Sequence, residues 1–225
     1  MRKNLEKIFF FTALAFGLFA FGKNIYSFFT TPATNTLMRR EYLTLMVEVP
    51  LGILLLCLPL LLRHYLKIKL PRPINLYYWF FIWLSVFLGT GLRLIIHIPF
   101  WDKILHTASP ILLTAIGYSI LAGLLKKVAV SDVNLWTFII FGFAFASMCG
   151  IFWEFWEFFC DTFLKMNLQR FESFTGTPYV GQKALLDTMG DLFTNMLGAL
   201  LMVVYSYFSV GKDPNYFTFF KIEKM

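Results

Sequence analysis

The stretch LWTFIIFGFAFASMCGIFWEFWEFFCD, from Leu135 to Asp161, decides the fold class of this chain. A membrane-spanning helix needs about 20 mainly apolar residues, and this stretch provides them. It also carries three acids, Glu154, Glu157 and Asp161, among Phe and Trp side chains. A carboxyl group in hydrocarbon costs about 2.5 kcal/mol or more, so these acids are predicted to face the protein interior or a hydrated cavity.

The composition of the whole chain is also that of an integral membrane protein. Of its 225 residues, 58% are hydrophobic and 15% are charged, whereas soluble domains have about 25% charged residues. The 28 Phe, ten Tyr and six Trp suit lipid-facing helices with aromatic residues at the interfaces. The net charge of +7 is scattered over short loops beside apolar runs, which indicates membrane orientation and no nucleic-acid partner.

Six stretches are long and apolar enough to span a membrane. They cover residues 7–29, 42–62, 74–98, 104–125, 135–161 and 187–208. Only short breakers separate most of them, so the sequence predicts one all-α transmembrane domain over residues 1–225, a polytopic helical bundle. The first stretch also resembles a signal peptide, but its apolar character continues through Ile25–Phe29, which favours an uncleaved helix. The connection 162–186 is either a surface loop or a re-entrant cap.

The distribution of Lys and Arg predicts the orientation. With six spans, the side that holds both termini carries about twice as many basic residues as the other side, so both termini are expected in the cytoplasm. The polar groups of five spans then fall near the extracytoplasmic helix ends. They are Glu48, Arg93, His97, Asp102, His106, Glu154, Glu157, Asp161, Asp187, Asp191 and Asn195.

The spacing of these groups places them on common helix faces, because residues three, four or seven apart point the same way. Arg93 and His97 share a face, as do Asp102 and His106. The triplets Glu154–Glu157–Asp161 and Asp187–Asp191–Asn195 each form a stripe that can face the bundle axis. A polar pocket between helices, open to the extracytoplasmic side, is therefore predicted.

Charge counting predicts what this pocket requires. Seven acids stand against Arg93 and Lys103 as permanent cations, which leaves an excess of five negative charges. Low-dielectric surroundings do not tolerate this excess, so either several acids are protonated or cations neutralise them. Carboxylates with imidazoles are suitable ligands for a divalent ion such as Zn, Mn, Fe, Mg or Ca. The favoured ligands are His106, Glu154, Glu157, Asp187 and Asp191.

The remaining polar residues are expected to support this site. Asp102 can orient the imidazole of His106, as carboxylates behind metal-bound histidines do. His97 is expected to bond backbone at a helix end, and Glu48 to pair with Arg93 or Lys103. Asp102 and Asp187 also stand where helix-capping acids belong. A structural network of ion pairs that only holds the helices together is the alternative to a metal site.

Three functions fit such a pocket. The leading hypothesis is metal-dependent chemistry on an envelope or lipid-linked substrate, such as phosphoester hydrolysis, with Glu154 or Glu157 as general base and Arg93 or Lys103 steadying a phosphate. A cation or proton carrier is the second, although the sequence shows no inverted repeat or broken helix pair. The third is a non-catalytic binder of a lipid headgroup or glycopeptide antibiotic. Membrane lipids are expected partners of all three, and the sequence does not determine the oligomeric state.

The segments WDKILH, FWEFWEF and LLDTMGDLFTNMLGAL, starting at Trp101, Phe152 and Leu185, together resemble the YjdF-like inner-membrane proteins and, distantly, VanZ-type proteins. The resemblance covers residues 93–201 and rests on the order and spacing of the motifs. It implies a helical bundle in the bacterial cytoplasmic membrane. The family's polar positions match Asp102, His106, Glu154, Glu157, Asp187 and Asp191. The VanZ-type likeness points toward the cell envelope and glycopeptide tolerance. The segment TPYVGQKALLD, from Thr177 to Asp187, departs from the family pattern and leaves any ligand on this loop open.

Overall fold

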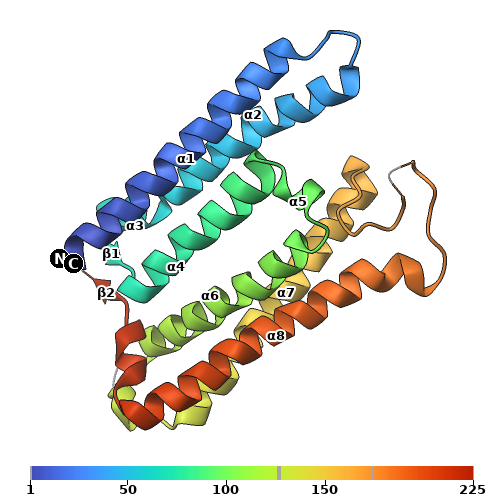
Figure 1. The fold of residues 1–225 in the computed structure, drawn as a ribbon. Coiled ribbons are helices and arrows are strands. Elements are labelled where there is room, and N and C mark those ends of the chain that lie inside the picture. The colour runs from blue at the N-terminus through green and yellow to red at the C-terminus, as the bar shows by residue number, and fades with distance from the viewer. Residues whose placement is uncertain (1, 126–127, 174, 225) are drawn as a thin grey trace. The chain divides into compact units, whose positions relative to one another are not determined.

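A computed structural model describes residues 2–125, 128–173 and 175–224 (Figure 1). This part of the chain contains eight α-helices, short π- and 3-10-helical segments and two strands of two residues each. Five helices are long and apolar enough to cross a membrane, and a sixth span results if a bent helix pair counts as one. The prediction of an all-α, multi-pass membrane bundle is confirmed, whereas the cytoplasmic position of both termini stays a prediction.

The chain divides into two compact units. The first holds the described residues up to Leu105 and from Ile222 on, and the second runs from His106 to Lys221. Helix α6 (Trp101–Leu124) begins in the first unit and continues without a break into the second.

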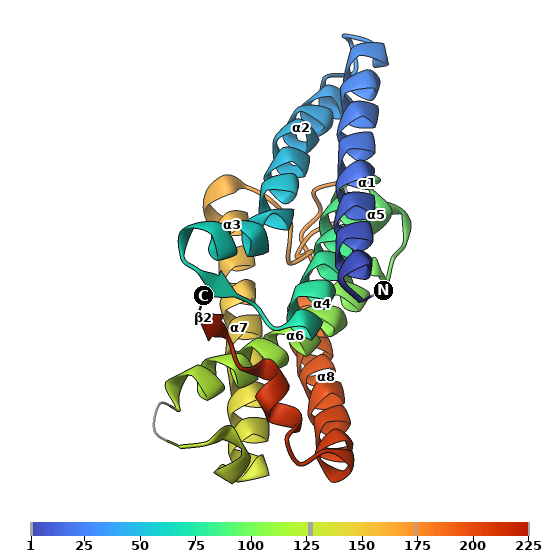
Figure 2. The same cartoon turned by 90° about the vertical axis from the view of Figure 1, so that its left-hand side faces the viewer.

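The first unit is built on a hairpin of α1 and α2, which lie side by side in Figures 1 and 2. Its elements are α1 (Arg2–Thr30), α2 (Thr36–Leu56), α3 (Leu58–Tyr65), β1 (Ile68–Lys69), α4 (Arg72–Ile82), the π-helix η1 (Trp83–Gly91), α5 (Leu94–His97) and β2 (Glu223–Lys224). β1 and β2 pair antiparallel. Phe10, Val49, Trp79 and Phe87 form the centre of a continuous apolar core.

The stretch predicted as one span over 42–62 is divided at Cys57, where α2 and α3 meet at 47°. Pro59 causes the bend, because it has no N–H to donate to the carbonyl of Leu55. Two aromatic side chains of α4 use the carbonyls that the bend exposes. The Tyr78 hydroxyl donates to Leu55 O at 2.7 Å, and the Trp79 indole donates to Leu56 O at 3.0 Å. The break is therefore hydrogen-bonded within the protein, as an irregular backbone at membrane depth must be.

The stretch predicted as one helix over 74–98 is also divided. α4 continues into the π-helix η1, which ends at Gly91, and Arg93 adopts a left-handed backbone with φ 65° before the single turn of α5. The amide of Asn24, a fully buried residue of α1, donates to Gly91 O at 3.2 Å. This bond satisfies a carbonyl at the end of the π-helix, where the regular ladder stops.

The second unit contains the rest of α6, η2 (Val130–Asp132), α7 (Leu135–Leu164), α8 (Gln182–Lys212) and η3 (Tyr216–Phe220). α7 and α8 are antiparallel neighbours. Trp136, at the start of α7, contacts Tyr207 near the end of α8, with ring centroids 6.0 Å apart. Farther along, Gly150 lies against Asn195, since a Cβ atom on Gly150 would be 2.7 Å from Asn195 Nδ2. Small residues thus let the two backbones approach closely.

The opposite faces of α7 and α8 suit lipid. Phe155 and Trp156 on α7, and Phe193 on α8, are more than half exposed within the protein, at 62%, 54% and 68%. The acids of α7 are buried on the other face, in line with Gly142 and Gly150. The separation of aromatic and acidic residues around one helix is the arrangement that the sequence predicts for a membrane-embedded polar site.

The end of the second unit near η3 is closed by aromatic packing. Phe217 of η3 stacks on Phe138 of α7 at 4.4 Å and also meets the ring of Tyr118 on α6. Ser206 Oγ lies 3.4 Å from the hydroxyl of Tyr216. Burial raises the pKa of Tyr216 to about 12, so its hydroxyl stays protonated and neutral in this packed end.

Candidate functional site

The candidate site lies where the start of α6, the end of α7 and the start of α8 meet. The antiparallel contact between Gly150 and Asn195 fixes the level of the acids. Glu154 stands one helical turn after Gly150 on α7, and Asp191 stands one turn before Asn195 on the antiparallel α8. Both side chains are buried, with exposed fractions of 4% and 0%. Two carboxyl groups from different helices are therefore brought to one level of the bundle.

His106 of α6 completes the centre of this group. Its Nδ1 atom lies 3.8 Å from Asp191 Oδ1, and the side chain is 8% exposed. Asp102 stands one turn earlier on the same helix. Ligand atoms of Asp102, His106 and Asp191 all lie within 4.8 Å of one another. The structure thus forms an acid–imidazole group from three of the residues that the sequence singled out.

The connection after α7 folds back over the acids. α7 ends at Lys165, which has a left-handed backbone with φ 57°. Asp161 then accepts two main-chain hydrogen bonds from this connection, from Leu168 N at 2.7 Å and from Gln169 N at 2.9 Å. Farther on, an isolated bridge pairs Glu172 with Pro178. The connection is an ordered loop over its described residues, held at its start by Asp161.

Each of the other acids has its own polar contact. The Gln169 amide donates to Glu154 Oε2 at 3.3 Å and also to the Glu154 carbonyl at 3.3 Å. The Trp153 indole donates to Glu157 Oε1 at 2.8 Å. Arg170 Nη1 lies 3.6 Å from Asp187 Oδ1. The loop after α7 therefore contributes side chains as well as backbone to the site.

Most of these contacts bring no positive charge. Gln169, Trp153 and main-chain N–H groups are neutral donors, which orient a carboxylate but leave its negative charge in place. Arg170 is the only Arg between His106 and Lys221 in the sequence. The five acids Glu154, Glu157, Asp161, Asp187 and Asp191 therefore outnumber the basic side chains named in these contacts, Arg170 and His106. This balance favours a bound cation or protonated acids.

Asn195 adds a polar group one turn beyond Asp191. It is 3% exposed, and its Nδ2 atom has no hydrogen-bond partner among the described residues. A buried amide without a partner costs free energy of about 1–3 kcal/mol. A ligand or an ordered water that accepts a hydrogen bond from Asn195 Nδ2 would remove this cost. The unpartnered amide is thus a second indication that the buried cluster binds a ligand or water.

The sequence of most of the chain matches a protein family. The family described as "Predicted membrane protein (DUF2238)" covers residues 11–212. The chain belongs to the DUF2238 family. The predicted likeness to YjdF-like proteins is confirmed, since these constitute DUF2238, whereas no finding supports the distant VanZ-type likeness. Comparisons with curated proteins and with solved structures give no match.

Other predicted residues of this DUF2238 protein have partners in the first unit. Arg93 forms an ion pair with Glu41, lies 3.9 Å from Met38 Sδ and has its guanidinium 5.9 Å from the ring centre of Tyr42. The expected pairing of Glu48 with Arg93 is not found. The guanidinium pairs instead with Glu41, which lies almost two turns nearer the start of α2. Lys103 Nζ lies 3.5 Å from Asp102 Oδ2.

The two remaining supporting residues are less enclosed. Glu48 is half-buried in α2 and has no hydrogen bond or ion pair with any residue that the structure describes. His97 is the last residue of α5 and its side chain is exposed. Neither residue has a contact that assigns it to the acid–imidazole group.

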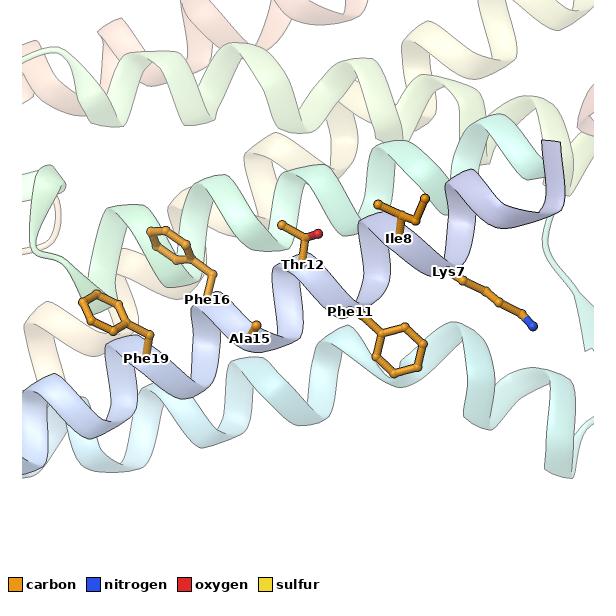
Figure 3. Close-up of a pocket in the computed structure, with 7 residues that line it drawn as sticks. All are labelled: Lys7, Ile8, Phe11, Thr12, Ala15, Phe16 and Phe19. Atoms are coloured by element: carbon orange, nitrogen blue, oxygen red, sulfur yellow. The ribbon is translucent and has the colours of Figure 1, made fainter. Parts of the chain in front are cut away.

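A groove also runs along α1 (Figure 3). Its lining residues are Lys7, Ile8, Phe11, Thr12, Ala15, Phe16 and Phe19. All belong to one helix, and Lys7 is the only ionisable residue among them. This groove is an apolar face of a membrane-spanning helix, and it carries no pair of groups able to perform chemistry.

Four residues that contact the predicted polar side chains of this DUF2238 protein were not predicted from the sequence. Trp153 could have been found, because it precedes Glu157 by four residues and so lies on the same helix face. The contacts of Gln169, Arg170 and Glu41 could not have been found in this way. Each reaches its partner through the path of a loop or a second helix, and sequence spacing carries no such information.

Proposed function

We propose that this DUF2238 protein binds a divalent metal ion at the extracytoplasmic ends of α6, α7 and α8, and that it acts there on a lipid-linked or envelope substrate of the bacterial cytoplasmic membrane. The observation that carries the proposal is the position of His106 beside Asp191 and Asp102, with ligand atoms within 4.8 Å. Asp187, Glu154 and Glu157 complete the predicted ligand set.

The distance between His106 and Asp191 suits two ligands of one ion. At 3.8 Å it exceeds a hydrogen bond between nitrogen and oxygen. Two ligands that lie about 2.0–2.4 Å from a shared ion are roughly 3 to 4 Å apart. A divalent cation also offsets the negative charge of the buried acids.

The reaction that fits best is hydrolysis of a phosphoester. Glu154 accepts a proton from the attacking water, the water oxygen forms a bond to phosphorus, and the ester P–O bond breaks. The proton then passes to the leaving alcohol oxygen. The bond from Gln169 supports this role for Glu154, because it holds the carboxylate at the level of Asp191.

Metal binding is tested by titrating the purified full-length protein with Mn²⁺ and Zn²⁺ and counting bound ions by mass spectrometry. We expect about one ion per chain in the wild type and an affinity at least about 10-fold lower in Asp191→Asn and His106→Gln. Asp132→Asn is the matched control, because Asp132 is an exposed acid of the same unit. Equal binding by wild type and Asp191→Asn, or no binding by the wild type, overturns the metal site.

Catalysis is tested separately with Glu154→Gln, which keeps the size and the hydrogen-bonding shape of the side chain. A hydrolase that uses Glu154 as its base loses turnover of a lipid-linked phosphoester in this variant, even at Mn²⁺ concentrations that saturate the remaining ligands. If the variant and the wild type bind the phosphoester equally and neither releases product, the site belongs to a binder and the hydrolytic proposal is rejected.

A cation or proton carrier is the second candidate, because the first unit contains irregularities that the sequence did not reveal. The break at Cys57 and the π-helix η1 are features that carriers use at ion sites. Flux of H⁺ or Mn²⁺ into liposomes that contain the protein, abolished by Asp191→Asn, would favour transport over hydrolysis.

A further inference from the structure

We infer that Arg170 binds a phosphate group of the ligand, at the rim of the acid–imidazole group. The inference deepens the proposed function, on which it rests, by assigning the ligand class and the residue that recognises it. It also moves the phosphate contact from Arg93 and Lys103 to a residue of the loop after α7.

The guanidinium of Arg170 lies beside an acid at the start of α8. Arg170 Nη1 lies 3.6 Å from Oδ1 of Asp187 on α8, a distance too long for a strong hydrogen bond. Asp187 precedes Asp191 by one helical turn, or about 6 Å along the axis. Arg170 therefore pairs with a residue that lies one helical turn from Asp191. In the proposed complex, Arg170 would donate to the phosphate while His106 and Asp191 would hold the metal ion that supplies the positive charge on its other side.

The side chain of Arg170 is also accessible to a ligand. Arg170 is 39% exposed at the side chain, whereas the Asp187 side chain is 11% exposed. The acid of this pair is thus enclosed and the cation faces outward. A planar guanidinium presents several N–H groups at once, so it can keep a contact to Asp187 while it donates to phosphate oxygens.

The loop around Arg170 carries more basic than acidic side chains. Lys165, at the end of α7, is exposed, whereas the Nζ atom of exposed Lys183, in the first turn of α8, lies over the ring of Tyr179 and takes no part in the proposed phosphate contact. Glu172 is the one acid in the described part of the loop between them. The rim is therefore basic above an acidic interior, and this combination suits an anion that reaches a metal ion.

Hydrogen bonds hold the loop next to Arg170 in place. Gln169, the neighbour of Arg170, is fixed through its backbone by Asp161 and through its side chain by Glu154. Arg170 itself has a left-handed backbone, with φ 48°. Such a conformation is costly outside glycine and is retained where surrounding contacts determine it.

The test compares phosphate binding by the wild type, Arg170→Gln and Arg170→Lys, with Lys183→Gln as the matched control. Lys183 is an exposed cation of the same rim, and its Nζ lies 3.9 Å from the ring centre of Tyr179. Phosphatidic acid in nanodiscs, against phosphatidylcholine, probes a lipid source, and inorganic phosphate probes a soluble one. All measurements use the full-length protein with and without Mn²⁺.

We expect Arg170→Gln to weaken phosphate binding about tenfold or more, Arg170→Lys to weaken it less, and Lys183→Gln to leave it within twofold. Preference for phosphatidic acid identifies a lipid ligand, and binding of inorganic phosphate alone identifies a soluble one. The inference is overturned if Arg170→Gln binds phosphate as Lys183→Gln does, or if the wild type binds neither probe.

The Mn²⁺ titration separates the two proposals. Arg170→Gln should retain Mn²⁺ affinity within about twofold, because the guanidinium is no metal ligand. If Mn²⁺ binds normally and the Arg170 variants bind phosphate like the wild type, only the role of Arg170 is rejected. If phosphate binding depends on Arg170 but the wild type does not bind Mn²⁺, only the metal site is rejected. Arg170→Lys keeps the positive charge and so separates the effect of charge from that of the guanidinium shape. Thermal unfolding of each variant shows whether the variant is still folded.

Discussion

At the scale of single residues, Asp161 is an acid near the candidate site whose carboxylate binds main-chain N–H groups. Its two carboxylate oxygens accept hydrogen bonds from consecutive main-chain N–H groups of the loop, at Leu168 and Gln169. The side chain itself is 7% exposed. The sequence predicted Asp161 as a supporting residue, and the structure indicates that this support consists in fixing the loop that carries Gln169 and Arg170.

We predict that Asp161→Ala releases this loop. Two partly buried N–H groups lose their acceptor, which costs about 1–3 kcal/mol. Hydrogen exchange at the amides of Leu168 and Gln169 should become at least about tenfold faster, while the interior of α7 and α8 stays protected. Asp213→Ala is a matched control, because Asp213 accepts a main-chain bond from Asn215 at 2.9 Å. Unchanged exchange at both loop amides in Asp161→Ala would contradict the assignment.

At the scale of elements, close packing of α6 against α8 holds His106 beside Asp191. Gly198 lies on the buried face of α8, one turn beyond Asn195. A Cβ atom at Gly198 would stand 2.1 Å from the main-chain oxygen of Thr107. Backbone cannot retreat as a side chain does, so only glycine permits this approach.

Gly198→Ala should therefore destabilise the protein, by about 1–3 kcal/mol, because the two helices must separate. Gly211→Ala in the same helix is the control, since a Cβ atom there meets nothing within 4 Å. Alanine favours a helix over glycine by about 1 kcal/mol, so this variant should unfold at the same or a higher temperature. Thermal unfolding in detergent, followed by circular dichroism, compares them. A Gly198→Ala protein as stable as wild type would show that α6 and α8 are not in this contact.

At the scale of the whole molecule, the orientation in the membrane determines which side the candidate site faces. Basic residues predict cytoplasmic termini, which puts the loop after α7 on the extracytoplasmic side. Either five or six spans agree with the structure, and an odd number would put the termini on opposite sides.

Cysteine labelling in intact cells decides this point. Thr175 and Ser131 are exposed residues of the loops at opposite ends of α7. We expect Thr175→Cys to react with a membrane-impermeant maleimide and Ser131→Cys to react only after the cells are opened. The unsubstituted protein, with Cys57, Cys149 and Cys160, gives the background signal. The reverse labelling pattern would place the site in the cytoplasm and exclude an extracytoplasmic substrate.

The sequence by itself determined the class of the fold and the faces of the helices. Runs of about 20 apolar residues predict spans wherever they occur, and a spacing of three or four residues puts Glu154, Glu157 and Asp161 on one buried side of α7. Both properties are local, because the rise and pitch of a helix fix which residues share a face. Only the tertiary structure decided which partner each group meets. Asp191 meets His106, Glu154 meets Gln169, and Arg93 meets Glu41, because those pairings depend on how helices cross and where loops return.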